Sequence, residues 1–181
     1  MKTNKLFFFM PLLLAIMLGV TGCSSDDEDS SISVNFQLQD EDGKECYNFK
    51  EGDNIVFRLD VINNGKEDVI IHHDIGYIIG NDIFHVYSSK GEDFGTPYDM
   101  LIIPEVGLTM IPSKNRISFF CPWVNNPKSE LTWNPSSLYV IDKLRPLPKG
   151  DYYSQFTIKL DDSRFVTCKK SFKIEWQWNS F

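Results

Sequence analysis

Three histidines near the middle of the chain are the residues best suited to metal chemistry. His72 and His73 precede Asp74, and His85 follows them. Imidazole and carboxylate groups are common ligands of zinc and of other divalent metals. On a strand, however, neighbouring side chains point to opposite faces, so His72 and His73 cannot hold one ion without a bulge. We therefore expect polar residues at a strand end and no metal site.

No other arrangement of residues matches a catalytic pattern. Asp40-x-Asp42-Gly43 echoes a calcium loop, but it lacks a third oxygen-bearing position before the glycine and a distal glutamate, so a turn is expected. The sequence has no Gly-rich phosphate loop, and no serine lies in a nucleophile-elbow context. We expect a protein that is not an enzyme and that carries no cofactor.

Three cysteines in the body of the chain show neither redox nor zinc spacing. Cys46, Cys121 and Cys168 form no CxxC pair. Their odd number allows at most one intrachain disulfide. We expect them to be small buried apolar residues, with their disulfide state left open.

Aromatic residues are the best candidates for ligand contact. Trp133 lies in a segment from Pro122 to Lys149 that carries five of the nine prolines and shows no strand periodicity. An exposed Trp on a long loop can stack on a sugar ring or anchor a protein partner. We take Trp133, Tyr139 and Trp123 as the candidate ligand-binding residues. The alternative is a structural role, with Trp133 capping the domain and Trp123 continuing the core face of the preceding strand.

The elements that position these residues are expected to be strands, because apolar and polar residues alternate through most of the chain. Alternation places every second side chain on one face, which predicts half-buried strands. We expect strands over 32–39, 46–49, 55–61, 83–87, 100–103, 152–160 and 172–178, and another that ends near Pro122. No segment after the N-terminal region has an apolar period of 3.6 residues. Residues 32–181 are therefore expected to form one all-β domain, a sandwich or a barrel.

Two details of this domain can also be predicted. Asn63-Asn64-Gly65-Lys66 is typical of a tight hairpin turn, because Asn-Gly readily takes positive φ. It should connect the strand over 55–61 to Val69-Ile70-Ile71. Trp176 and Trp178 share a face with Phe172 and Ile174, so both are expected in the core.

The N-terminal residues predict export. Lys2 and Lys5 precede an uncharged apolar stretch from Leu6 to Gly22, which suits a signal peptide and is short for a membrane span. Val20-Thr21-Gly22-Cys23 resembles the bacterial lipobox, which implies cleavage after residue 22 and acylation of Cys23. Two or more acyl chains anchor a protein stably to a membrane. An uncleaved anchor or an ordinary signal peptide is the alternative.

Residues 23–31 join the lipidated cysteine to the domain. Their acidic polar run, Ser24 to Ser31, predicts a disordered tether. The run resembles the surface-export signal of Bacteroidetes lipoproteins, which implies the outer face of the outer membrane; the periplasmic face is the alternative. The chain carries a net charge of −7, and the segment before Cys23 contributes two lysines and no acid. This sign argues against nucleic acid as a partner.

Several motifs together resemble BsuPI-like domains, which are immunoglobulin-like β-sandwiches named after an intracellular proteinase inhibitor. The motifs follow in the order expected of that family: residues 51–66, ending in Asn63-x-Gly65; Asp82-Ile83-Phe84-His85-Val86-Tyr87 with Gly91; Ile111-Pro112-Ser113-Lys114; and Pro148-Lys149-Gly150-Asp151-Tyr152. The resemblance covers roughly residues 45–175. The chain departs from the family in its expected export and in its longer stretch from Trp123 to Pro148. No inhibitory motif of the family can be carried over to its residues.

The resemblance implies an immunoglobulin-like β-sandwich as the fold. The function expected is a non-catalytic binding or interaction module with an unknown protein or glycan ligand, anchored to the membrane by lipid. A surface glycan-binding lipoprotein and a proteinase-inhibitor-like domain are the alternatives. The ligand and the oligomeric state stay open.

Overall fold

The computed structural model describes residues 31–71, 83–101, 109–126, 139–140, 144–160 and 164–176. These residues contain no helix, and so none long and apolar enough to cross a membrane. They form strands β1 (Ile32–Gln39), β2 (Asn48–Lys50), β3 (Ile55–Asn63), β4 (Val69–Ile71), β5 (Val86–Ser88), β6 (Asp93–Gly95), β7 (Met100–Leu101), β8 (Thr109–Ile111), β9 (Arg116–Trp123), β10 (Tyr139–Val140), β11 (Gly150–Lys159) and β12 (Phe165–Glu175).

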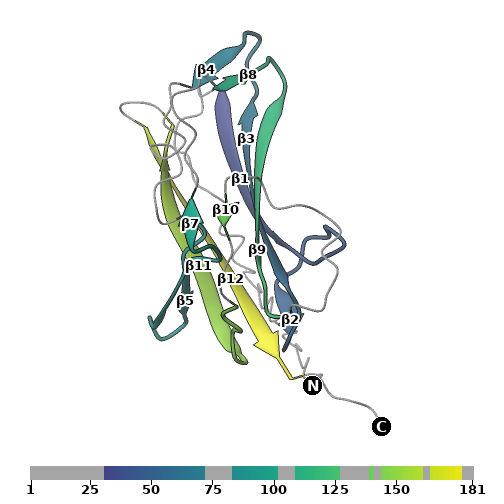
Figure 1. Ribbon diagram of the computed structural model, residues 1–181. Coiled ribbons are helices and arrows are strands. Elements are labelled where there is room, and N and C mark those ends of the chain that lie inside the picture. The colour runs from purple at the N-terminus through teal and green to yellow at the C-terminus, as the bar shows by residue number, and fades with distance from the viewer. Residues whose placement is uncertain are drawn as a thin grey trace, which may run out of the picture.

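The strands build two facing sheets (Figure 1). One sheet has three antiparallel strands in the order β1-β3-β9, and the other has the order β2-β12-β11-β5-β6. Two short pairs, β4-β8 and β10-β7, accompany them. The expectation of an all-β fold is confirmed, and the arrangement is that of a β-sandwich.

The core lies between the two sheets and follows the alternation of the strands. Along β3, Ile55, Phe57, Leu59 and Val61 are fully buried. From the facing sheet, Phe156 contributes its ring to the same interior, where aromatic side chains touch one another. Burial of one such side chain is worth about 1.5–3 kcal/mol. The rings that pack together in this way are Phe36, Phe57, Phe84, Trp123, Tyr152, Phe156 and Phe172.

The strand expected over 83–87 begins later, at Val86. Phe84 has a φ of 63°, in the left-handed region that an extended strand cannot use. Its ring is nevertheless fully buried and packs against Phe36 and Phe57. The backbone therefore bends at Phe84 so that this ring enters the core.

The prediction of a hairpin at Asn63-Asn64-Gly65-Lys66 is wrong. β4 pairs with β8, whereas β3 pairs with β1 and β9. Gly65 does not take positive φ. The buried Asn63 side chain directs the chain instead: its Nδ2 donates to the carbonyl oxygens of Glu67 and Ile111, at 2.8 and 3.0 Å, and its Oδ1 accepts from the Gly65 amide at 2.8 Å. Hydrogen bonds of the Asn63 side chain, rather than pairing of β3 with β4, thus hold this turn.

The pairing register defines two ends of the sandwich. Ile32 pairs with Asn63 at the end where the chain enters the domain, which we call the entry end. At the opposite end, which we call the far end, Gln39 pairs with Val56. β12 also finishes at the far end, where its Glu175 carbonyl accepts from the Glu51 amide at 2.8 Å. An eight-residue strand separates the two ends by roughly 25 Å.

Candidate ligand-binding site

The residues proposed from sequence lie in different settings. Cys23 and Trp133 are outside the described residues, as are His72, His73 and Asp74. Tyr139 belongs to β10, where its backbone pairs with Leu101. Of the three candidate ligand-binding residues, the described part of the chain therefore includes Trp123 and the backbone of Tyr139.

Trp123 occupies the core rather than the surface. It is 2% exposed, and its ring contacts Phe57. Its indole Nε1 donates to the carbonyl oxygen of Arg145 at 2.6 Å, which satisfies the polar atom of the buried ring. This is the core role weighed for Trp123 as the alternative, and it leaves no ring face for a ligand.

The expectation that Trp176 is buried is wrong. Phe172 and Ile174 are buried as expected, at 4% and 2% exposed, but Trp176 is 59% exposed. β12 ends at Glu175, and β11 begins at Gly150 opposite Ile174, so no paired strand covers the next position. Alternation of apolar and polar residues predicts which side chains are buried only as far as the strand itself extends.

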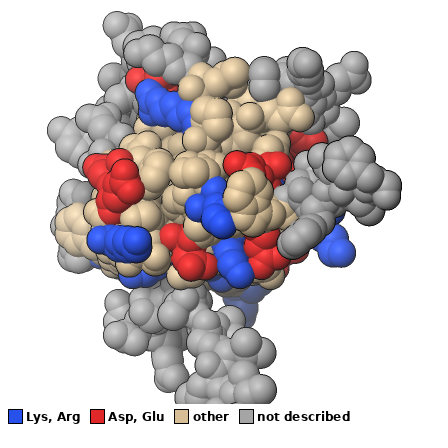
Figure 2. All heavy atoms as spheres, turned by 90° about the horizontal axis from the view of Figure 1, so that it is seen from below, with Lys and Arg blue, Asp and Glu red and all other residues tan. Residues whose placement is uncertain are grey.

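Trp176 lines a hollow of about 370 Å³ at the far end. This volume is at the lower end of the range typical of small-molecule sites, about 300–1,000 Å³. The start of β11 and the end of β12 form the hollow together. It is lined by Lys149, Gly150, Asp151, Lys173, Ile174, Glu175 and Trp176. Figure 2 views the molecule from this end and shows basic and acidic side chains interspersed there.

Both lysines of the hollow have close contacts with its other residues. Lys149 Nζ lies 4.7 Å from the centroid of the Trp176 ring, a cation–π contact worth about 0.5–1 kcal/mol at exposed sites. Lys173 Nζ lies 2.8 Å from Glu175 Oε1. This hydrogen bond and the charge of Glu175 raise the pKa of Lys173, and Asp151, its cross-strand partner, adds to the effect. The site thus presents two ammonium donors and two carboxylate acceptors beside one indole ring.

A fixed backbone corner holds Lys149 and Gly150 in place. Tyr152 is 4% exposed, and its hydroxyl donates to the Pro148 carbonyl oxygen at 2.6 Å. A Cβ on Gly150 would lie 3.3 Å from the Tyr152 ring, so this ring packs closely under the backbone of the corner. The hollow therefore has a rigid side, formed by β11.

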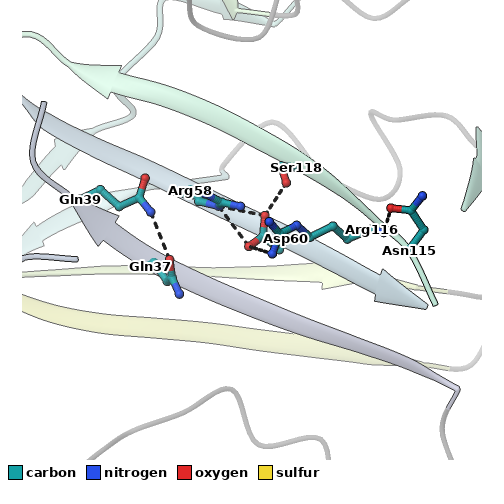
Figure 3. A network of polar contacts seen from close by, with 7 residues as sticks. All are labelled: Gln37, Gln39, Arg58, Asp60, Asn115, Arg116 and Ser118. Carbon is teal, nitrogen blue, oxygen red and sulfur yellow. Dashed lines mark hydrogen bonds and ion pairs between the residues drawn. The ribbon is translucent and has the colours of Figure 1, made fainter. Parts of the chain in front are cut away.

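A polar network covers the outer face of the three-stranded sheet (Figure 3). Asp60 is 2% exposed, and both its carboxylate oxygens accept from Arg58 Nε, at 3.0 and 3.1 Å. Ser118 Oγ donates to Asp60 at 2.5 Å, and Arg116 lies 4.0 Å away. The guanidinium of Arg58 also lies 5.0 Å from the Phe120 ring centroid. These contacts compensate the buried carboxylate, which is a structural role.

Stacked rings occupy the outer face of the five-stranded sheet. His85 stacks on Tyr87 with a centroid distance of 4.6 Å, and Tyr87 stacks on Tyr153 at 5.3 Å. Lys169 Nζ lies 4.2 Å from the Tyr153 centroid. His85 Nε2 is 2.6 Å from Asp93 Oδ1, and this hydrogen bond is the main cause of the lowered pKa of Asp93. Because the rings of His85, Tyr87 and Tyr153 stack face to face, this surface exposes ring edges rather than ring faces.

The described residues offer little for metal or nucleophilic chemistry. Among them, no three His, Cys, Asp or Glu side chains gather into a group that could hold a metal ion. Cys46, Cys121 and Cys168 are free thiols. Burial raises the pKa of Cys121, which keeps this thiol protonated and weakly nucleophilic.

The comparisons with known proteins leave the site to be judged on its geometry. No protein-family model matches the chain, and no curated protein matches it. The sequence did not predict that the aromatic and charged residues at the start of β11 and the end of β12 form a site. Pairing Lys149-x-Asp151 with Lys173-x-Glu175 across the last hairpin would have indicated them.

Proposed function

We propose that the protein is a non-catalytic binding module that is tethered by lipid to the bacterial outer membrane. The observation that carries the proposal is the exposed Trp176 in a hollow lined by charged residues at the far end of the sandwich. A large aromatic side chain held at the surface by rigid strands is typical of a binding site. Its four charged neighbours supply polar contacts that can orient a ligand.

An immunoglobulin-like fold is part of the proposal, and the Tyr152 corner supports it. Immunoglobulin-like domains carry a tyrosine near the start of a strand whose hydroxyl bonds to the backbone a few residues upstream. Tyr152 has this geometry with Pro148. Asn63, which opens the Asn63-x-Gly65 motif, donates to the carbonyl oxygen of Ile111, the first residue of the Ile111-Pro112-Ser113-Lys114 motif. Motifs that resemble the BsuPI-like pattern thus contact one another in space.

The proposed anchor fits the placement of the site. The chain enters the domain at Ser31, where the Ser31 carbonyl accepts from the Asn64 amide at 2.6 Å. Trp176 lies at the opposite end of the strands. A lipid on Cys23 would therefore tether the domain through its entry end, and the Trp176 hollow lies at the end farther from this attachment. We propose the outer face of the outer membrane as the location.

The test compares full-length protein with two variants on arrays of oligosaccharides and peptides and on a panel of proteinases. Trp176→Ala removes the proposed contact. Phe165→Ala is the matched control, because Phe165 is also exposed, at 63%, but lies at the other end of β12. The proposal predicts a ligand whose binding is lost in Trp176→Ala and kept in Phe165→Ala. Ligands that bind both variants equally, or no ligand in any class, would contradict it.

A further inference from the structure

We infer that the Trp176 hollow binds a neutral sugar ring of an oligosaccharide. The inference rests on the proposed binding function and names the ligand class of the same site. It follows from three properties of the described residues: the charge balance of the hollow, the arrangement of its donors and acceptors, and the absence of an apolar surround.

The charges of the hollow balance. Lys149 and Lys173 supply two positive charges, and Asp151 and Glu175 supply two negative charges. An anionic ligand would meet no excess of positive charge there, and the whole chain carries a net charge of −7. Long-range electrostatics therefore disfavour acidic sugars, phosphates and acidic peptides. A neutral ligand does not meet this barrier.

The polar groups match a ring of hydroxyl groups. Each sugar hydroxyl both donates and accepts, so it can bond to a carboxylate and to an ammonium that lie side by side. Lys173 Nζ and Glu175 Oε1 are already 2.8 Å apart, and Asp151 lies across from Lys173. Bonds to charged partners are stronger than bonds between neutral groups. The indole of Trp176 offers a flat face on which the apolar side of a sugar ring can stack.

The surroundings of Trp176 differ from those of a protein hot spot. Hot spots lie in well-packed pockets that are ringed by contacts which exclude water. Among the described residues that line the hollow, Ile174 is the only other one with an apolar side chain, and it is 2% exposed. The other large exposed apolar side chains of the described residues are Ile70, Met110, Leu144 and Phe165, and none of them lines the hollow. A lone aromatic ring among charges suits a sugar better than a protein.

The experiment titrates full-length protein, purified in a zwitterionic detergent so that no detergent sugar competes. The probes are neutral gluco-, manno-, galacto- and xylo-oligosaccharides, with uronic-acid oligosaccharides and peptides as the other ligand classes. Binding is measured by calorimetry. At least one neutral series should bind, and Trp176→Ala should weaken it about tenfold or more, since the stacked ring face is lost.

Three further variants separate stacking and hydrogen bonding from folding. Trp176→Phe keeps a ring and should recover part of the affinity. Glu175→Gln removes a charged acceptor and should weaken binding, whereas Phe165→Ala should leave it unchanged. Neutral sugars that bind Trp176→Ala as well as the original protein would overturn the inference. If only a peptide or an acidic sugar binds through Trp176, the sugar inference fails and the binding function stands. If no probe depends on Trp176, both fail.

Discussion

The hydrogen bond of Tyr152 provides a direct test of the corner that holds the binding hollow. Tyr152→Phe removes one hydroxyl and keeps the buried ring. The lost bond to Pro148, 2.6 Å long, is neutral and internal, and such a bond contributes about 0.5–1.5 kcal/mol. Pro148 is exposed, so water can replace the donor at its carbonyl oxygen. We therefore expect a loss of about 1 kcal/mol in the free energy of unfolding.

The neighbouring residue offers a matched control. Tyr153→Phe also removes one phenolic hydroxyl, but it keeps the ring that stacks on Tyr87 and lies under Lys169. No hydrogen bond joins the Tyr153 hydroxyl to the described part of the chain, so its removal should change stability by less than about 0.5 kcal/mol. Urea unfolding, followed by tryptophan fluorescence, measures both variants. With a slope of about 1–3 kcal/mol per molar urea, Tyr152→Phe should lower the midpoint by roughly 0.3–1 M.

The same pair of variants has a predicted pH dependence. Burial raises the pKa of Tyr152 above its ordinary value of 10.0, and the charge of Glu92 adds to the rise. The folded protein therefore keeps this proton at a pH where the unfolded chain has lost it. The stability that results is complete below pH 10 and falls as the pH rises through the raised pKa. Tyr152→Phe should lose less stability than the original protein above pH 10. Equal urea midpoints for the two Phe variants, together with equal alkaline slopes, would refute this account of the corner.

Three further predictions follow from burial and from the proposed anchor. Trp123→Ala should cost about 3–5 kcal/mol of stability, as truncations of buried Trp do. Trp176→Ala should cost no more than about 1 kcal/mol, the value of its contact with Lys149. Equal thermal melts of the two variants would contradict the placement of both rings. A thiol reagent should modify the half-buried Cys46 in the native protein before the buried Cys121, and simultaneous modification of both would contradict the core placement of Cys121. Mass spectrometry should find acyl chains on an N-terminal Cys23, and Cys23→Ala should release the protein from the membrane or stall its processing.

Much of the β-sandwich could be predicted because apolar and polar residues alternate over most of its long strands. The strand over 32–39 and the buried face of Phe57 and Leu59 follow directly from the side-chain period of two. The predicted hairpin after β3 failed because the deciding contact is distant: Asn63 bonds to Ile111, which no local pattern can show. The Asn-Gly pair indicates which backbone conformations a turn can adopt, whereas the tertiary hydrogen bonds of Asn63 determine which one it takes.

The candidate site was the harder part to predict, and the failure has the same cause. Trp176 continues the apolar face of β12 in sequence, but the partner strand β11 begins at Gly150, opposite Ile174. The core therefore ends at Ile174, two residues before Trp176. Where a sheet stops depends on its neighbours and cannot be read from one strand. The cysteines could be predicted as buried residues in part, since Cys121 and Cys168 are buried while Cys46 is half-buried.

The last strand lies inside its sheet, and this has a consequence for the order of events during synthesis. β12 sits between β2 and β11, and it pairs in parallel with β2, a strand made early in translation. A nascent chain that lacks residues 165–175 cannot join β2 to the rest of the sheet. Pairings between distant segments also form slowly. We therefore expect such a chain to stay unfolded until residues 165–175 have been made, and the proposed export would require an unfolded precursor of this kind. Removal of residues 165–175 should therefore abolish the folded domain rather than shorten it.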